Sequence, residues 1–161
     1  MKTTITDTDK GWKALQEYLK AQAPEGPHVK VGVLGASATA AHASSKLTNV
    51  EIAGIHEFGR GKVPERSFIR SAFDSNKPKY ENAMRKLADK VLTQQMTPRV
   101  AMGVLGQMIQ SDVQKRFEDG IPPPLKDSTI TRRFAMGYKS TKPLIVTSQL
   151  KNSITYETVD V

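Results

Sequence analysis

The chain has 161 residues, the length of one domain and enough to bury a hydrophobic core. It has no cysteine, which excludes disulfides, thiolate metal sites and cysteine nucleophiles. Its 24 Lys and Arg outnumber 16 Asp and Glu, and the net charge of +8 favours a polyanion or an acidic protein surface as partner.

The apolar content of the chain is low, with 38% hydrophobic and 6% aromatic residues. We therefore expect part of the chain to be ordered only against partners. No stretch approaches the roughly 18 apolar residues of a membrane span, and the N-terminal residues lack the apolar segment of an export signal. We expect no membrane partner.

The N-terminal third predicts a helix, a strand and a loop. Residues 9–22 predict an amphipathic helix that ends at the prolines and glycine of residues 24–27. Its apolar residues and candidate caps are Trp12, Leu15 and Leu19, and Thr8 and Asp9. Residues 28–34 alternate valine with other residues, which is typical of a half-buried strand. The small, polar residues 36–47 predict a flexible loop.

A short helix is predicted after Thr48, because Thr48 and Glu51 have the spacing of a capping box. Apolar residues then follow at helical spacing: Ile52, Ile55 and Phe58. We expect Phe58 to anchor this helix in the core, and we expect Gly59 to end the helix and reverse the chain.

Two long helical segments are predicted next. Residues 67–93 carry apolar side chains mostly three and four residues apart, which predicts one long helix or two helices that meet near Pro78. Thr97 followed by Pro98 is a strong start signal for a helix that continues to Gly120. Its expected apolar face comprises Val100, Val104, Met108, Ile109, Val113 and Phe117.

The C-terminal part predicts a connector, a short helix and a strand. Three prolines at 122–124 form a stiff connector, and a short helix capped by Asp127 or Ser128 follows through Phe134. Residues 144–161 then predict an apolar segment, a polar turn at 147–152 and a strand from Ile154.

These elements predict a single α+β domain over residues 1–161, in which a small, mostly antiparallel sheet packs against two or three long helices. The expected strands are 28–34 and 154–161, covered on one side by the helices of 67–117. Residues 1–27 are the N-terminal helix and its connector.

No pattern in the chain indicates catalysis or a cofactor. His56 and Glu57 begin a zinc-protease motif, but Arg60 stands where that motif requires a second histidine. His28 and His42 have no carboxylate at ligand-like spacing. The glycines match no phosphate loop, and the serines match no nucleophile elbow. We therefore expect no enzymatic activity, no metal and no cofactor.

Small groups of basic residues occur along the chain, and Arg132 with Arg133 is the candidate polyanion contact. A helix-turn-helix signature and an aromatic stacking platform are both missing, so sequence-specific DNA binding is not expected. Non-specific contact with the DNA backbone requires only charge and stays open. A basic DNA-binding accessory protein is therefore the alternative function, and a hydrolase with an unrecognised site is a third.

Three segments have motif character. Residues 52–59 read IAGIHEFG, residues 63–70 read VPERSFIR, and residues 144–154 read LIVTSQLKNSI. Their order and patterns resemble those of the phage minor tail components, also called tail-completion or neck proteins, of long-tailed phages. The family's patterns are a block ending in an acidic residue, Phe and Gly, then I-P-x-R-P-F, then L-x-x-T-G-x-L-x-x-S-I. The chain departs from them at Ser67, where the family has proline, and at Ser148, where it has glycine.

The resemblance marks a set of structural or interface residues: Glu57, Phe58, Gly59, Pro64, Arg66, Phe68, Thr147, Leu150, Ser153 and Ile154. Arg66 has two interpretations, a forked hydrogen bond to carbonyls or a carboxylate and a plain surface charge. In the third block, Thr147 and Ser153 are expected to bond the backbone around a turn while Leu150 and Ile154 pack inward.

The resemblance implies a structural virion protein at the head-proximal end of a phage tail, which acts in tail completion and head–tail joining. Its implied location is the virion, and the host cytoplasm during assembly. Its implied partners are copies of itself in a cyclic oligomer and the tail-tube, terminator or connector proteins. Exposed sheet edges and a small core suit surfaces that neighbours complete.

Overall fold

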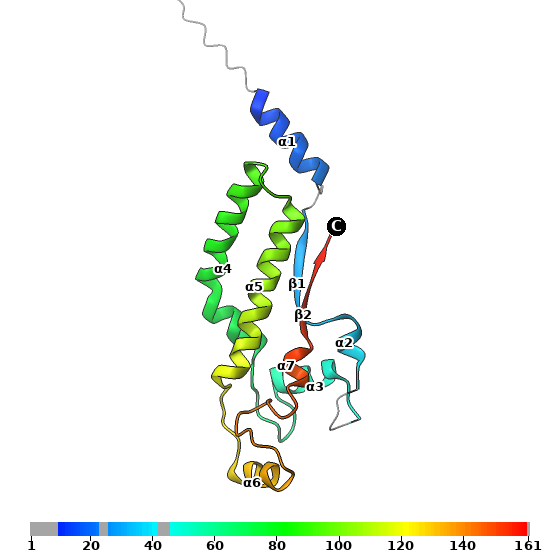
Figure 1. The fold of residues 1–161 in the computed structure, drawn as a ribbon, viewed down its shortest axis with the longest axis vertical. Helices are drawn as coiled ribbons and strands as arrows, with labels where there is room; N and C mark the ends of the chain where they lie inside the picture. The colour runs from blue at the N-terminus through cyan, green and yellow to red at the C-terminus, as the bar shows by residue number, and fades with distance from the viewer. Residues whose placement is uncertain (1–9, 23–25, 42–45, 161) are drawn as a thin grey trace, which may run out of the picture.

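The computed structural model describes residues 10–22, 26–41 and 46–160. The described part of the chain forms seven helices and two strands in an α+β arrangement, as expected (Figure 1). In chain order these are α1 (Lys10–Gln22), β1 (His28–Val33), α2 (Gly35–Thr39), α3 (Asn49–Phe58), α4 (Ile69–Leu92), α5 (Pro98–Asp119), α6 (Asp127–Ala135), α7 (Gln149–Asn152) and β2 (Ile154–Val159). The predicted cap residues Thr8 and Asp9 lie outside the described residues.

The two strands form an antiparallel sheet, which confirms the predicted pairing of the two distant segments. Val33 lies opposite Ile154, and the register runs to His28 opposite Val159. Between them Val31 lies opposite Tyr156, on the face that packs against α5. With only two strands, the sheet depends on packing against a helix for its stability.

The long helices and the sheet form successive layers. Figure 1 shows α4 beside α5, and α5 between α4 and the sheet, so α5 is the central element. Pro78 lies inside α4, which is therefore one helix, the first of the two alternatives. Thr97 caps α5 as predicted, since its hydroxyl accepts the Val100 N–H at 3.3 Å, and Gly120 follows the last helical residue.

Gly106 permits the close approach of α5 to the sheet. A Cβ atom at this position would lie 2.5 Å from Val29 Cγ2 and 2.6 Å from Tyr156 Cδ2. The prediction of the buried face of α5 was wrong for Val100 and Val104, which are exposed. A helix held between two layers buries small residues at its contact points, so the apolar pattern alone does not locate its inner face. The buried residues are Ala101, Leu105, Gly106, Ile109, Val113 and Phe117.

The capping box of α3 is confirmed, but its predicted core face was wrong. The Thr48 N–H donates to Glu51 Oε2 at 2.8 Å, and the Glu51 N–H donates to the Thr48 hydroxyl at 3.4 Å. The buried residues of α3 are Asn49, Ala53 and Glu57. Phe58 does not anchor the core, because Glu57 turns inward and the next residue lies about 100° away around the helix.

Three further predictions of local structure were wrong. Residues 36–39 of the predicted loop belong to α2, where the Ser37 hydroxyl bonds the carbonyls of Leu34 and Ser153; residues 42–45 lie outside the described part. The polar turn at 147–152 contains the one-turn helix α7. The N-cap of α6 is Lys126, not Asp127 or Ser128, and its side chain makes no capping bond.

Candidate functional site

The Glu57 carboxylate lies at the N-terminus of α4 and is almost fully buried. Both of its oxygens accept hydrogen bonds from residues 67–70. The donors are the N–H groups of Phe68 (2.8 Å), Ile69 (3.0 Å) and Arg70 (3.0 Å), the Ser67 hydroxyl (2.7 Å) and Arg70 Nε (3.1 Å). The first N–H groups of a helix have no partner within the helix, so this carboxylate caps α4 from another helix.

The protonation state of Glu57 reflects two opposing effects. Burial on its own raises the pKa of Glu57, because it disfavours the charged form. The hydrogen bonds from Arg70, Ile69, Ser67 and Phe68 favour the carboxylate, and together they hold its pKa below the ordinary value. Glu57 is therefore an ionised structural group at neutral pH.

Arg66 is buried, with 6% of its surface exposed, and it holds the proline connector. Its Nε donates to the Pro123 carbonyl at 2.8 Å, and its Nη2 donates to the Pro124 carbonyl at 3.2 Å. Its backbone N–H also donates to the His56 carbonyl at 2.7 Å. Of the two interpretations, the forked hydrogen bond to carbonyls is confirmed.

The third block packs as predicted around Ser148, which has a left-handed φ of 58° that glycine adopts more readily than serine. The Ser153 hydroxyl donates to the Leu150 carbonyl at 2.7 Å, and the Thr147 hydroxyl accepts the Gln149 N–H at 3.4 Å. Leu150 and Ile154 are both buried.

The three blocks meet at one pocket of about 210 Å³, which we call the junction pocket. Each block contributes side chains to its wall, and so does α6. Its principal lining residues are Ile52, His56, Arg66, Arg133, Thr147 and Leu150. Residues far apart in the sequence thus form one site, and the spacing within each block held no signal of this pocket.

Arg132 and Arg133 differ in environment, although they are neighbours in α6. Arg132 is exposed, whereas Arg133 is half-buried and lines the junction pocket. Arg133 Nη1 donates to the carbonyls of Ser140 (3.3 Å), Lys142 (2.9 Å) and Ile145 (3.3 Å). Burial lowers the pKa of Arg133, and the nearby charge of Arg66 lowers it further. Only Arg132 has the exposure expected of a general polyanion contact.

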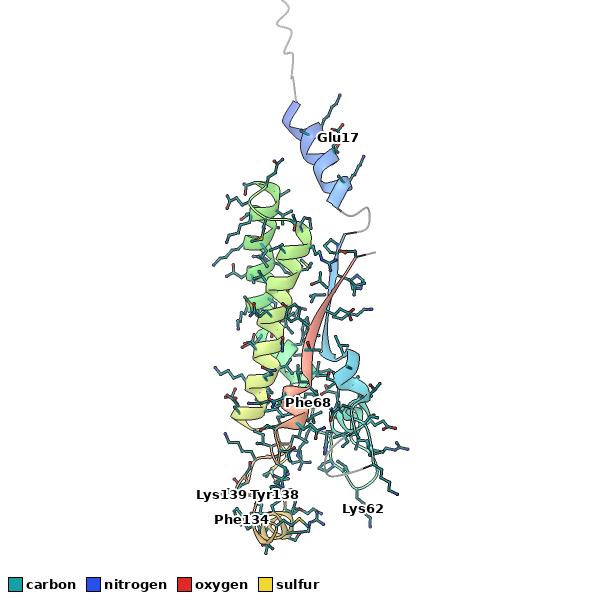
Figure 2. All side chains as sticks on the ribbon, turned by 45° about the vertical axis from the view of Figure 1, so that its right-hand side comes forward. Glu17, Lys62, Phe68, Phe134, Tyr138 and Lys139 are labelled. Atoms are coloured by element: carbon teal, nitrogen blue, oxygen red, sulfur yellow. The ribbon has the colours of Figure 1, made fainter. Side chains whose placement is uncertain are left out.

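The remaining motif residues divide between surface and interior. Phe58 is 67% exposed, and the Arg70 guanidinium lies 4.9 Å from the centre of its ring. Pro64 is exposed. Gly59 has a φ of 72°, and a Cβ there would lie 2.9 Å from the Glu65 nitrogen, so the predicted chain reversal depends on glycine. Phe68 is fully buried within the body of the molecule (Figure 2).

The described residues contain no group of three or more His, Asp or Glu side chains arranged to hold a metal ion. Among the helices of the described part, none is long and apolar enough to cross a membrane. The chain matches no known protein family, no characterised protein and no solved structure.

Proposed function

We propose that this chain is a structural virion protein at the head-proximal end of a phage tail, where it completes the tail and joins it to the head without covalent chemistry. The observation that supports this proposal is the convergence of residues 52–59, 63–70 and 144–154 at the junction pocket. These are the three segments that resemble the tail-completion family.

Direct contacts between the blocks support the interpretation that they form one site. Glu57 of the first block caps the helix that begins in the second block. Arg66 of the second block and Leu150 of the third line one pocket. The meeting of three segments that lie far apart in the sequence at one site favours a common role for them.

A second copy of the chain is the partner that best fits the opposite end of the molecule. An apolar groove of about 380 Å³ lies there between the last turns of α4 and the first turns of α5. Its lining includes Pro27, Met84, Leu87, Val91, Leu92 and Met102. Helix α1 is drawn beyond this end of the α4–α5 pair (Figure 1).

Helix α1 has the sequence pattern of a segment that docks into an apolar groove. In the sequence, Trp12, Leu15 and Leu19 recur at helical spacing, and Lys13 and Glu17 are exposed. Because Pro27 just after α1 lines the groove of its own copy, we expect α1 of a neighbouring copy to fill that groove. A repeated head-to-tail contact of this kind closes into a ring when the rotation between neighbouring copies divides a full turn.

The test is the mass of the full chain in solution, alone and with purified tail tubes. We expect a ring that binds one end of the tube in electron micrographs. Leu15→Asp should abolish the ring, whereas Ala14→Asp on the exposed face of α1 should preserve it. A chain that stays monomeric in both conditions and binds no tube contradicts the proposal.

A further inference from the structure

The junction pocket concentrates positive charge. Arg66 and Arg133 both line it together with His56, and its wall contains no Asp or Glu. The ion pairs found among the described residues involve neither arginine. The neighbouring carboxylate, Glu57, is already bonded to the start of α4.

Backbone carbonyls accept hydrogen bonds from both arginines, but no carboxylate forms an ion pair with either of them among the described residues. Arg66 bonds two carbonyls through Nε and Nη2, and Arg133 bonds three carbonyls through Nη1. A guanidinium has five N–H donors, so these bonds leave donors on both side chains for a ligand. Burial, and after it the nearby charge of Arg66, lower the pKa of Arg133, and an anion between the two arginines would relieve their repulsion.

The shape and lining of the pocket select the kind of anion. Ile52, Leu144, Val146 and Leu150 form apolar parts of the wall, so a suitable ligand has an apolar stem and a charged end. An aspartate or glutamate side chain has both, and arginine binds carboxylates with two parallel hydrogen bonds. A phosphate of duplex DNA is flanked by sugars on both sides and has no apolar stem that could pack against these side chains.

We propose that the junction pocket binds an acidic side chain of a neighbouring protein chain, with its carboxylate held between Arg66 and Arg133. This inference rests on the proposed function, since it names the chemistry of the partner at the site where the motif blocks meet. The neighbour supplies the negative charge that the pocket lacks, and Arg133 then couples that contact to the segment 140–145.

The test uses propionate, which reproduces the end of a glutamate side chain, and its neutral counterpart propionamide. Each is titrated into the isolated full chain at constant ionic strength while amide chemical shifts are recorded by NMR. Propionate should shift the amides of Thr147 and Gln149 in a saturable manner, and propionamide should not. Arg133→Gln should weaken propionate binding by about tenfold or more, or about 1.4 kcal/mol. Arg132→Gln should leave it unchanged.

Several results overturn this inference. They are an absence of saturable shifts with propionate in the wild-type chain, equal shifts with propionamide, and inorganic phosphate binding about tenfold tighter than propionate. The titration of the wild-type chain still tests whether the pocket binds a carboxylate, even if Arg133→Gln unfolds part of the chain. Because no tail tube takes part, a negative result here leaves tube binding untouched, and a failure to bind tubes leaves the propionate result standing.

Discussion

The Phe68 backbone N–H donates a 2.8 Å hydrogen bond to Glu57 Oε2, across eleven residues of chain. This bond joins α3 to the start of α4 at the point where the Phe68 ring packs against Phe117, with 4.8 Å between ring centres. A buried charge and a buried aromatic contact therefore hold the same corner of the fold.

Replacement of the Glu57 carboxylate is expected to destabilise the fold strongly. Glu57→Gln keeps the shape of the side chain but loses the charge, and it directs an N–H₂ group toward donors. We expect the free energy of unfolding to fall by about 2 to 4 kcal/mol, measured by denaturant titration. Glu65→Gln is the control, since Glu65 bonds the same Arg70 at the exposed surface and should have a much smaller effect.

The same carboxylate predicts a pH dependence of stability. The pKa of Glu57 in the folded chain lies below its ordinary value of 4.5, so below that value the unfolded chain binds more protons. The contribution of Glu57 is complete above about pH 4.5 and is lost as the pH falls through the folded pKa. In Glu57→Gln this part of the acid sensitivity should be missing. An identical dependence of the free energy of unfolding on pH in the wild-type chain and in Glu57→Gln contradicts this prediction.

The two motif phenylalanines should differ in their effect on stability. Phe68 is fully buried, and Phe68→Ala should cost about 3 to 5 kcal/mol. Phe58 is largely exposed and loses mainly its contact with Arg70, so Phe58→Ala should cost about 0.5 to 1 kcal/mol. Thermal melts of both variants decide the matter, and a large loss for Phe58→Ala speaks against the exposed position of its ring.

The contrast between Phe58 and Glu57 also shows what the sequence alone can predict. Caps, helix ends and strand alternation are local, so Thr48, Thr97 and the two strands could be located from neighbouring residues. Which face of α3 turns inward depends on the unpaired N–H groups of α4, which local spacing does not reveal. The junction pocket likewise needs Arg133, which reaches it only through the tertiary fold.

Ser148 offers a test of the turn that starts α7. Its φ of 58° is costly for a residue with a side chain, so Ser148→Gly should leave stability unchanged or raise it by up to about 1 kcal/mol. Ser153→Gly is the control, because Ser153 has an ordinary φ of −80° and its buried hydroxyl bonds Leu150. Ser153→Gly should lower the thermal midpoint, and a loss of stability in Ser148→Gly contradicts the strain argument.

Two glycines of α5 should respond to alanine in opposite directions. A methyl group at Gly106 overlaps Val29 and Tyr156, so Gly106→Ala should cost about 1 to 3 kcal/mol. The nearest atom to a methyl group at Gly103 is Thr158 Oγ1 at 3.8 Å, so Gly103→Ala should stabilise the helix by up to about 1 kcal/mol. Denaturant midpoints of the pair check this, and equal effects contradict the close packing of α5 on the sheet.

Substitution of Arg132 and of Arg133 should distinguish an exposed charge from a charge that holds the fold. Arg133→Gln removes hydrogen bonds to the 140–145 segment, so it should lower stability by about 1 to 2 kcal/mol and speed amide exchange there. Arg132→Gln should do neither, because Arg132 is exposed.

Any DNA binding by this chain of net charge +8 should be independent of sequence and weaken with salt. If Arg132 contacts a phosphate, Arg132→Gln reduces the salt slope by about 0.9. A preference of about tenfold for one DNA sequence, about 1.4 kcal/mol, contradicts the structural role and favours the DNA-binding alternative.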